Sequence, residues 1–189
     1  MIASSHSLAL RSARLTLALI LPAVAAGSLL AAPVINELHY NNDINTTFNE
    51  FVEIYNPGPG EVDLSGWQLT GGIEFTFEAG TMLPEDGYLV IGERPSTIQA
   101  IYGVSALGPY EGGLSGEGET IDLVDEMGER IDRVNYDGGP AFPDPNGASM
   151  TLGGGNDATT NDDGANWCEG TRIYGDGDLG TPGSVNFCP

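Results

Sequence analysis

The folds open to this chain are restricted by a series of short apolar runs with a period of two, which Gly, Pro, Asn and Asp interrupt. In one run Ile73, Phe75 and Phe77 alternate with Glu74 and Thr76. A period of two with one apolar face is what a half-buried antiparallel strand requires, and Gly- and Pro-rich breaks are typical of turns. The pattern predicts an all-β protein, a sandwich or a barrel.

The apolar runs predict eight strands and one short helical turn. The strands are expected at residues 34–40, 50–56, 62–70, 73–77, 88–92, 120–125, 130–136 and 149–152. Residues 95–102 instead have helical spacing, with Ile98, Ile101 and Tyr102 on one face and Ser96 available as an N-cap. No segment recurs at a fixed period, which argues against a solenoid or a propeller.

The first 26 residues have the three parts of a secretory signal peptide. Arg11 and Arg14 precede an apolar run, and the small residues Ala-Val-Ala follow at 23–25. The alternative is an uncleaved membrane anchor, because the apolar character continues to Ala32 and approaches the roughly 20 residues that span a bilayer. We favour cleavage, since proline and glycine interrupt the run. This predicts an extracytoplasmic protein, secreted or periplasmic, with no membrane segment after cleavage.

The charge of the chain narrows the class of partner. It has 27 acidic residues and six basic ones, all of them arginine. Two arginines lie in the leader, so the remaining chain has 27 acidic residues against four basic ones, a net charge of −23. Such a charge repels phosphate backbones, and we therefore expect no nucleic-acid partner. The 40% of hydrophobic residues is enough to build a core, which argues against disorder.

The two cysteines, Cys168 and Cys188, both lie near the C-terminus. In an exported chain an even cysteine number predicts a disulfide, here closing a loop of about 20 residues worth roughly 3 kcal/mol. A zinc site lacks ligands, because His39 is the only histidine after the leader. We expect one sandwich over residues 33–152, followed by a Gly-, Asn- and Asp-rich tail, 153–189, that the disulfide pins to it.

Several segments resemble the lamin tail domain found in exported bacterial proteins. They are Val34-Ile35-Asn36-Glu37-Leu38, Asn49-Glu50-Phe51-Val52-Glu53-Ile54-Tyr55-Asn56-Pro57, Val62-Asp63-Leu64-Ser65-Gly66-Trp67-Gln68-Leu69 and Thr81-Met82-Leu83-Pro84-Glu85-Asp86-Gly87-Tyr88-Leu89-Val90. The ending Gly175 to Gly183, with Asn166-Trp167-Cys168 before it, resembles the segment that follows this domain in bacterial chains. The resemblance implies an immunoglobulin-like antiparallel β-sandwich that serves as a binding or structural module, and it supplies no catalytic residues.

Three glutamates are the candidates for acid/base chemistry. Glu53, between Val52 and Ile54, is interpreted as the outward side of an alternating strand. A glycosidase pair needs two carboxylates facing one cleft, and Glu37 and Glu50 could approach each other only if their strands pair. The chain also lacks a nucleophile motif such as Gly-x-Ser-x-Gly. We therefore predict that it is not an enzyme.

Three other side chains have a structural and a functional interpretation. His39 could act as a general base, but a lone histidine at a strand end is more often structural or exposed. Trp67 and Trp167 could stack on sugars. We expect Trp67 to pack in the core and Trp167, beside a cysteine, to seal the tail against the sandwich.

The tail also contains candidate calcium ligands, because carboxylate oxygens on glycine-rich loops suit this ion. They are Asp162, Asp163, Asp176 and Asp178. Residues 176–180 match only the start of an EF-hand loop, and Asp, Asn and Gly are ordinary turn residues. Two functions remain: a metal-free interaction or structural module that presents an acidic surface to an unknown protein or surface polymer, and a calcium-dependent adhesive or carbohydrate-binding module. We expect no other cofactor.

Overall fold

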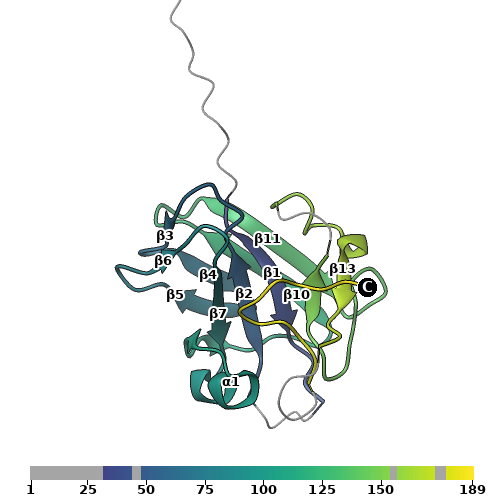
Figure 1. The fold of residues 1–189 in the computed structure, drawn as a ribbon. Helices are drawn as coiled ribbons and strands as arrows, with labels where there is room; N and C mark the ends of the chain where they lie inside the picture. The colour runs from purple at the N-terminus through teal and green to yellow at the C-terminus, as the bar shows by residue number, and fades with distance from the viewer. Residues whose placement is uncertain (1–31, 44–47, 154–156, 173–177) are drawn as a thin grey trace, which may run out of the picture.

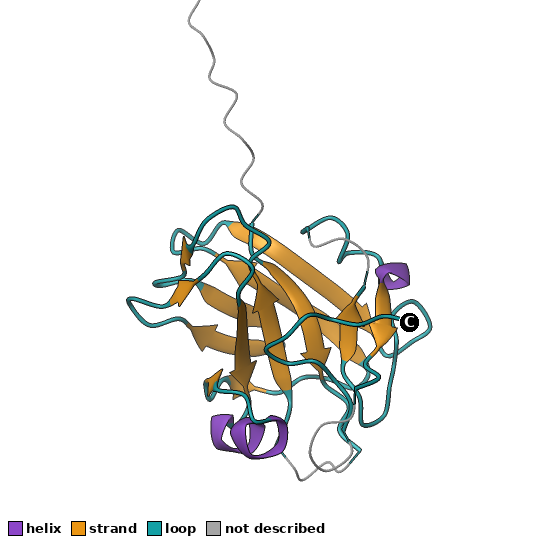
Figure 2. Ribbon diagram, viewed as in Figure 1, coloured by secondary structure: helices purple, strands orange, loops and turns teal. Residues whose placement is uncertain are grey.

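The computed structural model of the protein describes residues 32–43, 48–153, 157–172 and 178–189. The predicted signal peptide, residues 1–26, lies outside them. In the described residues two packed β-sheets form the body of the molecule, with one short α-helix at one end and a 3-10 turn elsewhere (Figures 1 and 2). The predicted all-β fold is therefore confirmed.

The first sheet has six strands in the order β13-β12-β1-β2-β7-β8, and all its pairs are antiparallel except β7 with β8. Their bounds are β1 (Val34–His39), β2 (Phe51–Tyr55), β7 (Tyr88–Gly92), β8 (Ala106–Leu107), β12 (Met150–Leu152) and β13 (Trp167–Glu169). β13 lies beyond the last strand that the sequence predicts, so the segment after residue 153 adds a strand to this sheet.

The second sheet has five strands in the order β11-β10-β4-β5-β9. Their bounds are β4 (Gln68–Gly71), β5 (Ile73–Thr76), β9 (Glu111–Gly112), β10 (Gly118–Val124) and β11 (Arg130–Asp137). A separate two-stranded ribbon joins β3 (Val62–Asp63) to β6 (Met82–Leu83). The single strand predicted at 62–70 is wrong: the Trp67 amide N–H donates to the Leu64 carbonyl and closes a turn between β3 and β4.

The predicted helical turn is α1 (Pro95–Tyr102). Ser96 is not its cap. Arg94 occupies the N-cap position with no side-chain hydrogen bond, and Pro95 begins the helix because its fixed φ suits the first turn and it has no N–H to satisfy. Gly103, with φ 71°, ends it in the left-handed conformation.

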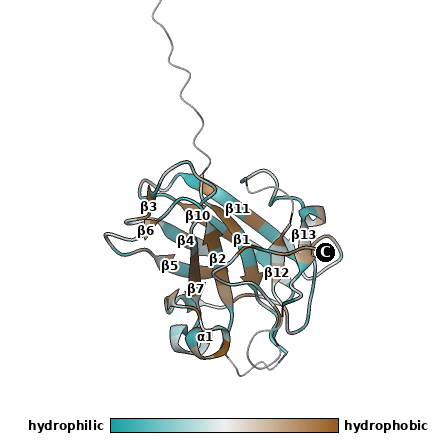
Figure 3. Ribbon diagram, in the orientation of Figure 1, coloured by the Kyte–Doolittle hydropathy of each residue, from teal (hydrophilic) through white to brown (hydrophobic). Residues whose placement is uncertain are grey.

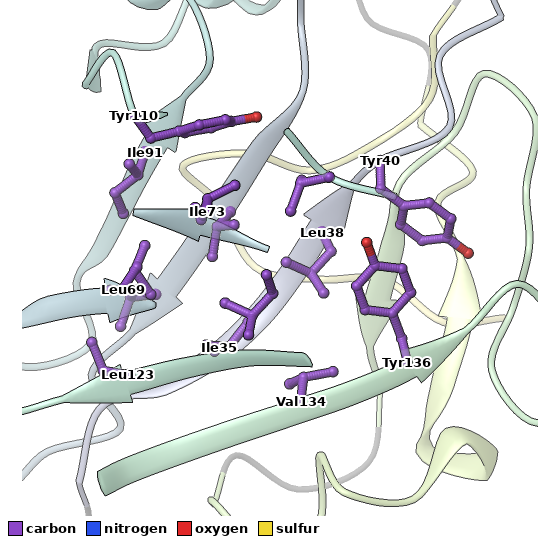
Figure 4. Packing of buried hydrophobic residues seen from close by; sticks show 14 of the residues in the cluster. Ile35, Leu38, Tyr40, Leu69, Ile73, Ile91, Tyr110, Leu123, Val134 and Tyr136 are labelled. Carbon is purple, nitrogen blue, oxygen red and sulfur yellow. The ribbon is translucent and has the colours of Figure 1, made fainter. Parts of the chain in front are cut away.

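The core fills the space between the two sheets. Figure 4 shows Ile35 and Leu38 of β1 facing Leu69, Leu123 and Val134 of the second sheet. The hydropathy colouring places brown residues along the strands of the same layers (Figure 3). The rings of Tyr40 and Tyr136 lie 4.5 Å apart between their centroids at one end of this core.

A β-bulge in β1 determines which of its side chains face the core and which lie on the opposite face of the sheet. The register of β1 with β2 shifts between Ile35 and Glu37, so that Asn36 is the extra residue. Ile35 and Leu38 can therefore both face the core although they are three residues apart. Glu37 and His39 then lie on the opposite face of the sheet, toward the C-terminal segment.

That opposite face is covered rather than open to solvent. Under α1 a second apolar cluster contains Phe51, Val90, Ile98 and Tyr102. Over β1 and β2 runs the C-terminal segment, residues 178–189, drawn in yellow in Figure 1. No helix in the described part of the chain is long and apolar enough to cross a membrane.

Candidate functional site

Two carboxylates face each other beneath the C-terminal segment. Glu37 of β1 and Glu53 of β2 are directly paired in the antiparallel register, and both side chains are fully buried. Glu53 therefore lies on the outward side of its strand, as its alternation predicts, but it is not in contact with solvent. It does alternate with the core residues Val52 and Ile54, but the face on which it lies is covered.

The C-terminal segment holds both carboxylates through its Thr181-Pro182-Gly183 turn. Glu37 Oε1 accepts hydrogen bonds from the Thr181 amide N–H at 2.7 Å and from the Ser149 hydroxyl at 2.6 Å. Glu53 Oε2 accepts from the Gly183 amide N–H. Gly183 has φ 77°, a left-handed conformation that glycine adopts readily. The pair therefore fastens the end of the chain to the sheet.

Burial changes the ionisation of this pair. Desolvation raises the pKa of Glu37 from 4.5 to about 7, although the hydrogen bonds from Ser149 and Thr181 oppose the rise. The pKa of Glu53 is raised well above 4.5, first by its own burial and then by the neighbouring charge of Glu37. Two like charges in one buried site are costly, so the pair favours protonation near neutral pH.

The Thr181 hydroxyl supports a protonated Glu37. It lies 2.9 Å from Glu37 Oε2 and 2.8 Å from Asn186 Oδ1, yet it has only one hydrogen to donate. Both contacts are satisfied if protonated Glu37 donates to Thr181, which then donates to Asn186. The Asn186 amide in turn donates to the carbonyls of Asn36 and Leu152. A proton on Glu37 therefore completes a network that joins the C-terminal segment to β1 and β12.

Glu50 does not join this pair. Its Oε2 accepts from the Leu114 amide at 3.0 Å and lies 3.2 Å from the Tyr110 hydroxyl. The antiparallel register explains why, since it places Glu37 opposite Glu53 rather than opposite Glu50.

The Glu37–Glu53 pair is a structural clamp in this structure and not a cleft with two opposed catalysts. Both carboxylates are fully buried and held by internal partners, which leaves no room for a substrate between them.

A second polar cluster lies next to the clamp, around His39. The His39 ring is buried, stacks on Phe51 at 5.6 Å between centroids, and lies 3.8 Å from an Asp178 carboxylate oxygen. Burial lowers the pKa of His39 to about 4, so the imidazole is neutral at pH 7 and its contact with Asp178 is not an ion pair there. Asp178 also accepts a hydrogen bond from the Asn49 amide.

Buried hydrogen bonds hold the connection between β12 and β13 against the sandwich. Asp132 Oδ2 accepts hydrogen bonds from the Ile35 main-chain N–H at 2.6 Å and from the Asn161 side-chain amide at 2.7 Å. The Trp167 indole N–H donates to the Asn161 carbonyl at 2.9 Å. Trp167 is buried against Phe142, and Trp67 lies in the core, so both tryptophans are packed within the molecule.

The calcium candidates lie in different surroundings. Asp162 and Asp163 are exposed, and Asp163 caps the short 3-10 helix η1 (Gly164–Asn166) by accepting from the Ala165 amide. Asp178 is buried beside His39, and Asp176 lies outside the described residues. Within the described ranges no three His, Cys, Asp or Glu side chains group to hold a metal. The calcium site stays a prediction.

The predicted disulfide is confirmed: Cys168 of β13 is bonded to Cys188 near the end of the chain. It lies close to the clamp, because Thr151, the neighbour of both sulfurs, pairs with Glu37 across β12 and β1. Sequence reasoning missed Ser149, Thr181 and Asn186 as partners of the carboxylates. The Gly-Thr-Pro-Gly ending at 180–183 was the one signal that could have pointed to them.

Comparison with known families gives one match. The sequence model of the Lamin Tail Domain family matches residues 30–138, more than half of the chain. The match covers β1 to β11 and therefore both carboxylates of the clamp, whereas Thr181 and Gly183 lie beyond it. No match was found among curated proteins.

Proposed function

Because this chain belongs to the lamin tail domain family, we propose that it is an exported, non-enzymatic interaction module that presents an acidic surface to a protein or a surface polymer. The family is an immunoglobulin-like β-sandwich without catalytic machinery, and such folds act through their surfaces. The calcium-dependent module stays the alternative.

The observation that carries this proposal is the separation of the carboxylates into two sets. Glu37 and Glu53 are buried and hold the C-terminal segment, and the half-buried Glu50 accepts a hydrogen bond from the Leu114 amide. Many other acidic side chains are exposed on strands and turns, among them Glu61, Asp63, Glu74, Glu78, Glu85, Asp86, Glu111, Glu117, Glu126 and Glu129. Their charge favours cationic partners and disfavours nucleic acid.

The chain has few arginines of its own that could neutralise this acidic surface. Arg133 forms a two-pronged ion pair with Asp122, with N–O distances of 2.6 and 2.7 Å. The Arg94 guanidinium lies over the Phe48 ring at 4.0 Å. The chain has 27 acidic residues, so most of its carboxylates have no arginine to neutralise them. This excess supports recognition of a basic partner.

Export rests on the leader composition and on the disulfide, which persists in oxidising compartments. The test is fractionation of the native cells, with N-terminal sequencing of the exported form. A mature N-terminus near residue 27 is expected. Recovery of the chain only in the cytoplasm, with Met1 intact, would contradict the proposal.

Binding is tested by capture of partners from the culture medium and cell surface on the immobilised protein. We expect partners that bind at low salt and elute as salt rises, because the attraction is electrostatic. Retention in EGTA supports the metal-free module, and loss in EGTA supports the calcium-dependent alternative. Hydrolysis of a surface polymer by the purified protein would overturn the non-enzymatic assignment.

A further inference from the structure

An open cleft lies at one side of the sandwich, between β5 of the second sheet and β8 at the edge of the first. Its volume is about 670 Å³. Apolar side chains and carboxylates line it together, the main ones being Phe75, Leu107, Pro109, Glu74, Glu78 and Glu111. A cleft of this size with mixed lining can accept several residues of a peptide.

The cleft exists because the pairing of β5 with β9 stops early. β9 pairs with β5 only through Gly112 opposite Ile73 and Glu111 opposite Glu74. The next residue of β5 whose main-chain N–H and C=O groups face the β9 side is Thr76. Continuation of the same register would place Pro109 opposite it. Proline has no N–H to donate. Pro109 therefore offers no donor for the Thr76 carbonyl, the recorded pairing stops at Glu111, and β5 keeps an open edge.

The main chain of Thr76 faces this cleft. The Phe77 amide N–H donates to the Trp67 carbonyl on the β4 side at 2.9 Å. Successive residues of a strand point their N–H and C=O groups to opposite sides, so those of Thr76 point away from β4. On the β9 side, the Gly113 amide N–H donates to the Gly72 carbonyl.

We propose that this cleft binds an extended segment of a partner protein that carries basic residues on both sides of an apolar one. The segment adds a strand to β5 through the N–H and C=O groups of Thr76. Its apolar side chain contacts Phe75 and Leu107, and its basic side chains meet the glutamates. This inference rests on the proposed function, since it names the surface and the kind of partner.

Charge selects this occupant over others. Glu74 and Glu111 lie directly opposite each other on β5 and β9, where like charges are destabilising. A basic side chain between them relieves that repulsion, and Glu78 adds a third carboxylate to the same cleft. A second copy of this chain would instead bring further glutamates against β5, which blunts edge-to-edge pairing.

The test uses a blocked synthetic peptide, Gly-Arg-Val-Arg-Val-Arg-Gly, and the full exported chain near physiological ionic strength. Binding is followed by NMR through the Thr76 and Leu107 amides, which gives both the site and the dissociation constant. A peptide with glutamate in place of arginine is the charge control. We expect the basic peptide to shift these amides and the acidic one to leave them unchanged.

Matched variants separate this cleft from general attraction to an acidic protein. Glu74→Gln with Glu78→Gln should weaken binding about twofold to fivefold for each carboxylate. Glu126→Gln with Glu129→Gln, in the exposed turn between β10 and β11, removes the same charge elsewhere and should leave the affinity within twofold, as roughly expected for a distant exposed pair. Equal weakening by both pairs would overturn the site.

A separate binding measurement tests whether the peptide adds a strand to β5. N-methylation of the central peptide residues removes main-chain donors without changing charge, and should weaken binding about threefold to tenfold. Unchanged affinity would overturn the pairing with β5. The inference and the proposed function can fail separately: a native partner that binds the Glu74→Gln, Glu78→Gln variant as well as the parent contradicts the cleft alone, whereas the absence of any surface partner contradicts the function.

Discussion

Glu37 and Glu53 lie opposite each other on neighbouring strands, fully buried, and both accept hydrogen bonds from one turn of the C-terminal segment. This relationship links three distant parts of the sequence. It also couples the attachment of the C-terminus to the protonation of two acids. Replacing one partner of such a buried network usually costs more than its net contribution, because the other partner is left unsatisfied.

The first prediction concerns Glu37→Gln and pH. A raised folded-state pKa means that the folded protein holds its proton more tightly than the unfolded chain, so stability falls as pH rises from about 4.5 to about 7. The shift corresponds to about 3 kcal/mol. The glutamine side chain cannot ionise and mimics the protonated acid. We expect the variant to gain about 3 kcal/mol relative to the parent between pH 4.5 and pH 8.

Urea unfolding at a series of pH values measures this difference. Glu126→Gln is the control, because it removes one exposed carboxylate at the β10–β11 turn and should give a nearly constant difference from the parent. High salt throughout suppresses the repulsion among surface carboxylates. A constant difference for Glu37→Gln as well would show that Glu37 titrates like an exposed acid.

The second prediction concerns His39→Phe, and its sign is opposite. Burial lowers the pKa of His39 from 6.5 to about 4, so the stability that depends on neutral His39 is present above pH 6.5 and is lost as pH falls toward 4. Phenylalanine keeps the ring beside Phe51 and Tyr102 without the proton equilibrium. The variant should gain on the parent by about 3 kcal/mol on acidification.

The same urea series decides between two states of His39. If His39 formed a true ion pair with Asp178 across their 3.8 Å separation, its pKa would be raised and the variant would lose stability on acidification instead. Far- and near-ultraviolet circular dichroism of both proteins at pH 7 controls for packing around the new phenylalanine.

The elements that the sequence predicts well are those with strong local patterns. β7, with bounds 88–92, and α1, with bounds 95–102, agree residue for residue because periodicity and flanking Gly or Pro define both ends. The strands that were missed, β6, β8, β9 and β13, have two or three residues each. Such short strands are set by their partners in the sheet and leave no periodic signal.

The clamp was beyond sequence reasoning for a different reason. Alternation correctly placed Glu53 on the face away from the core, but nothing local shows that the C-terminal segment covers that face 130 residues later. The bulge at Asn36 also changes the side on which Glu37 lies, and a bulge follows from packing of Ile35 and Leu38 rather than from a motif. Burial of a polar residue by a distant segment is a tertiary property.

The third prediction concerns Gly180→Ala. An added Cβ would lie 2.8 Å from Glu37 Oε1 and 2.9 Å from the Ser149 hydroxyl, closer than such atoms can approach. The carboxylate or the C-terminal segment must move, and we expect a loss of about 1 to 3 kcal/mol. Gly116→Ala is the matched control, because nothing lies within 4 Å of its added Cβ.

Thermal and urea unfolding of the two glycine variants supply the measurement. Gly116→Ala should stay within about 0.5 kcal/mol of the parent. Combining Gly180→Ala with Ser149→Ala frees space beside Glu37 and should not add the two separate losses, since both act on the same oxygen. Full additivity would place the effect of Gly180→Ala outside the clamp.

The last prediction concerns the disulfide. Cys168 lies in the edge strand β13, and Cys188 follows Asn186, which bonds across to Asn36 and Leu152. The bond therefore holds the C-terminal segment against the sheet at a point next to the clamp. In the chain-entropy account, opening a loop with a sequence separation of 20 costs about 3 kcal/mol of stability. Replacement of both cysteines by alanine should show this loss in urea unfolding.

The loss of stability should also be local, because every strand except β13 precedes both cysteines in the sequence. The amides of Thr181 and Gly183, which donate to Glu37 and Glu53, report directly on the attachment of the C-terminal segment. Their hydrogen exchange should accelerate in the double alanine variant well before that of Val52 and Ile54 in the central strand β2. Equal acceleration at all four amides would show instead that the disulfide stabilises only the global fold, and that the clamp holds the segment without it.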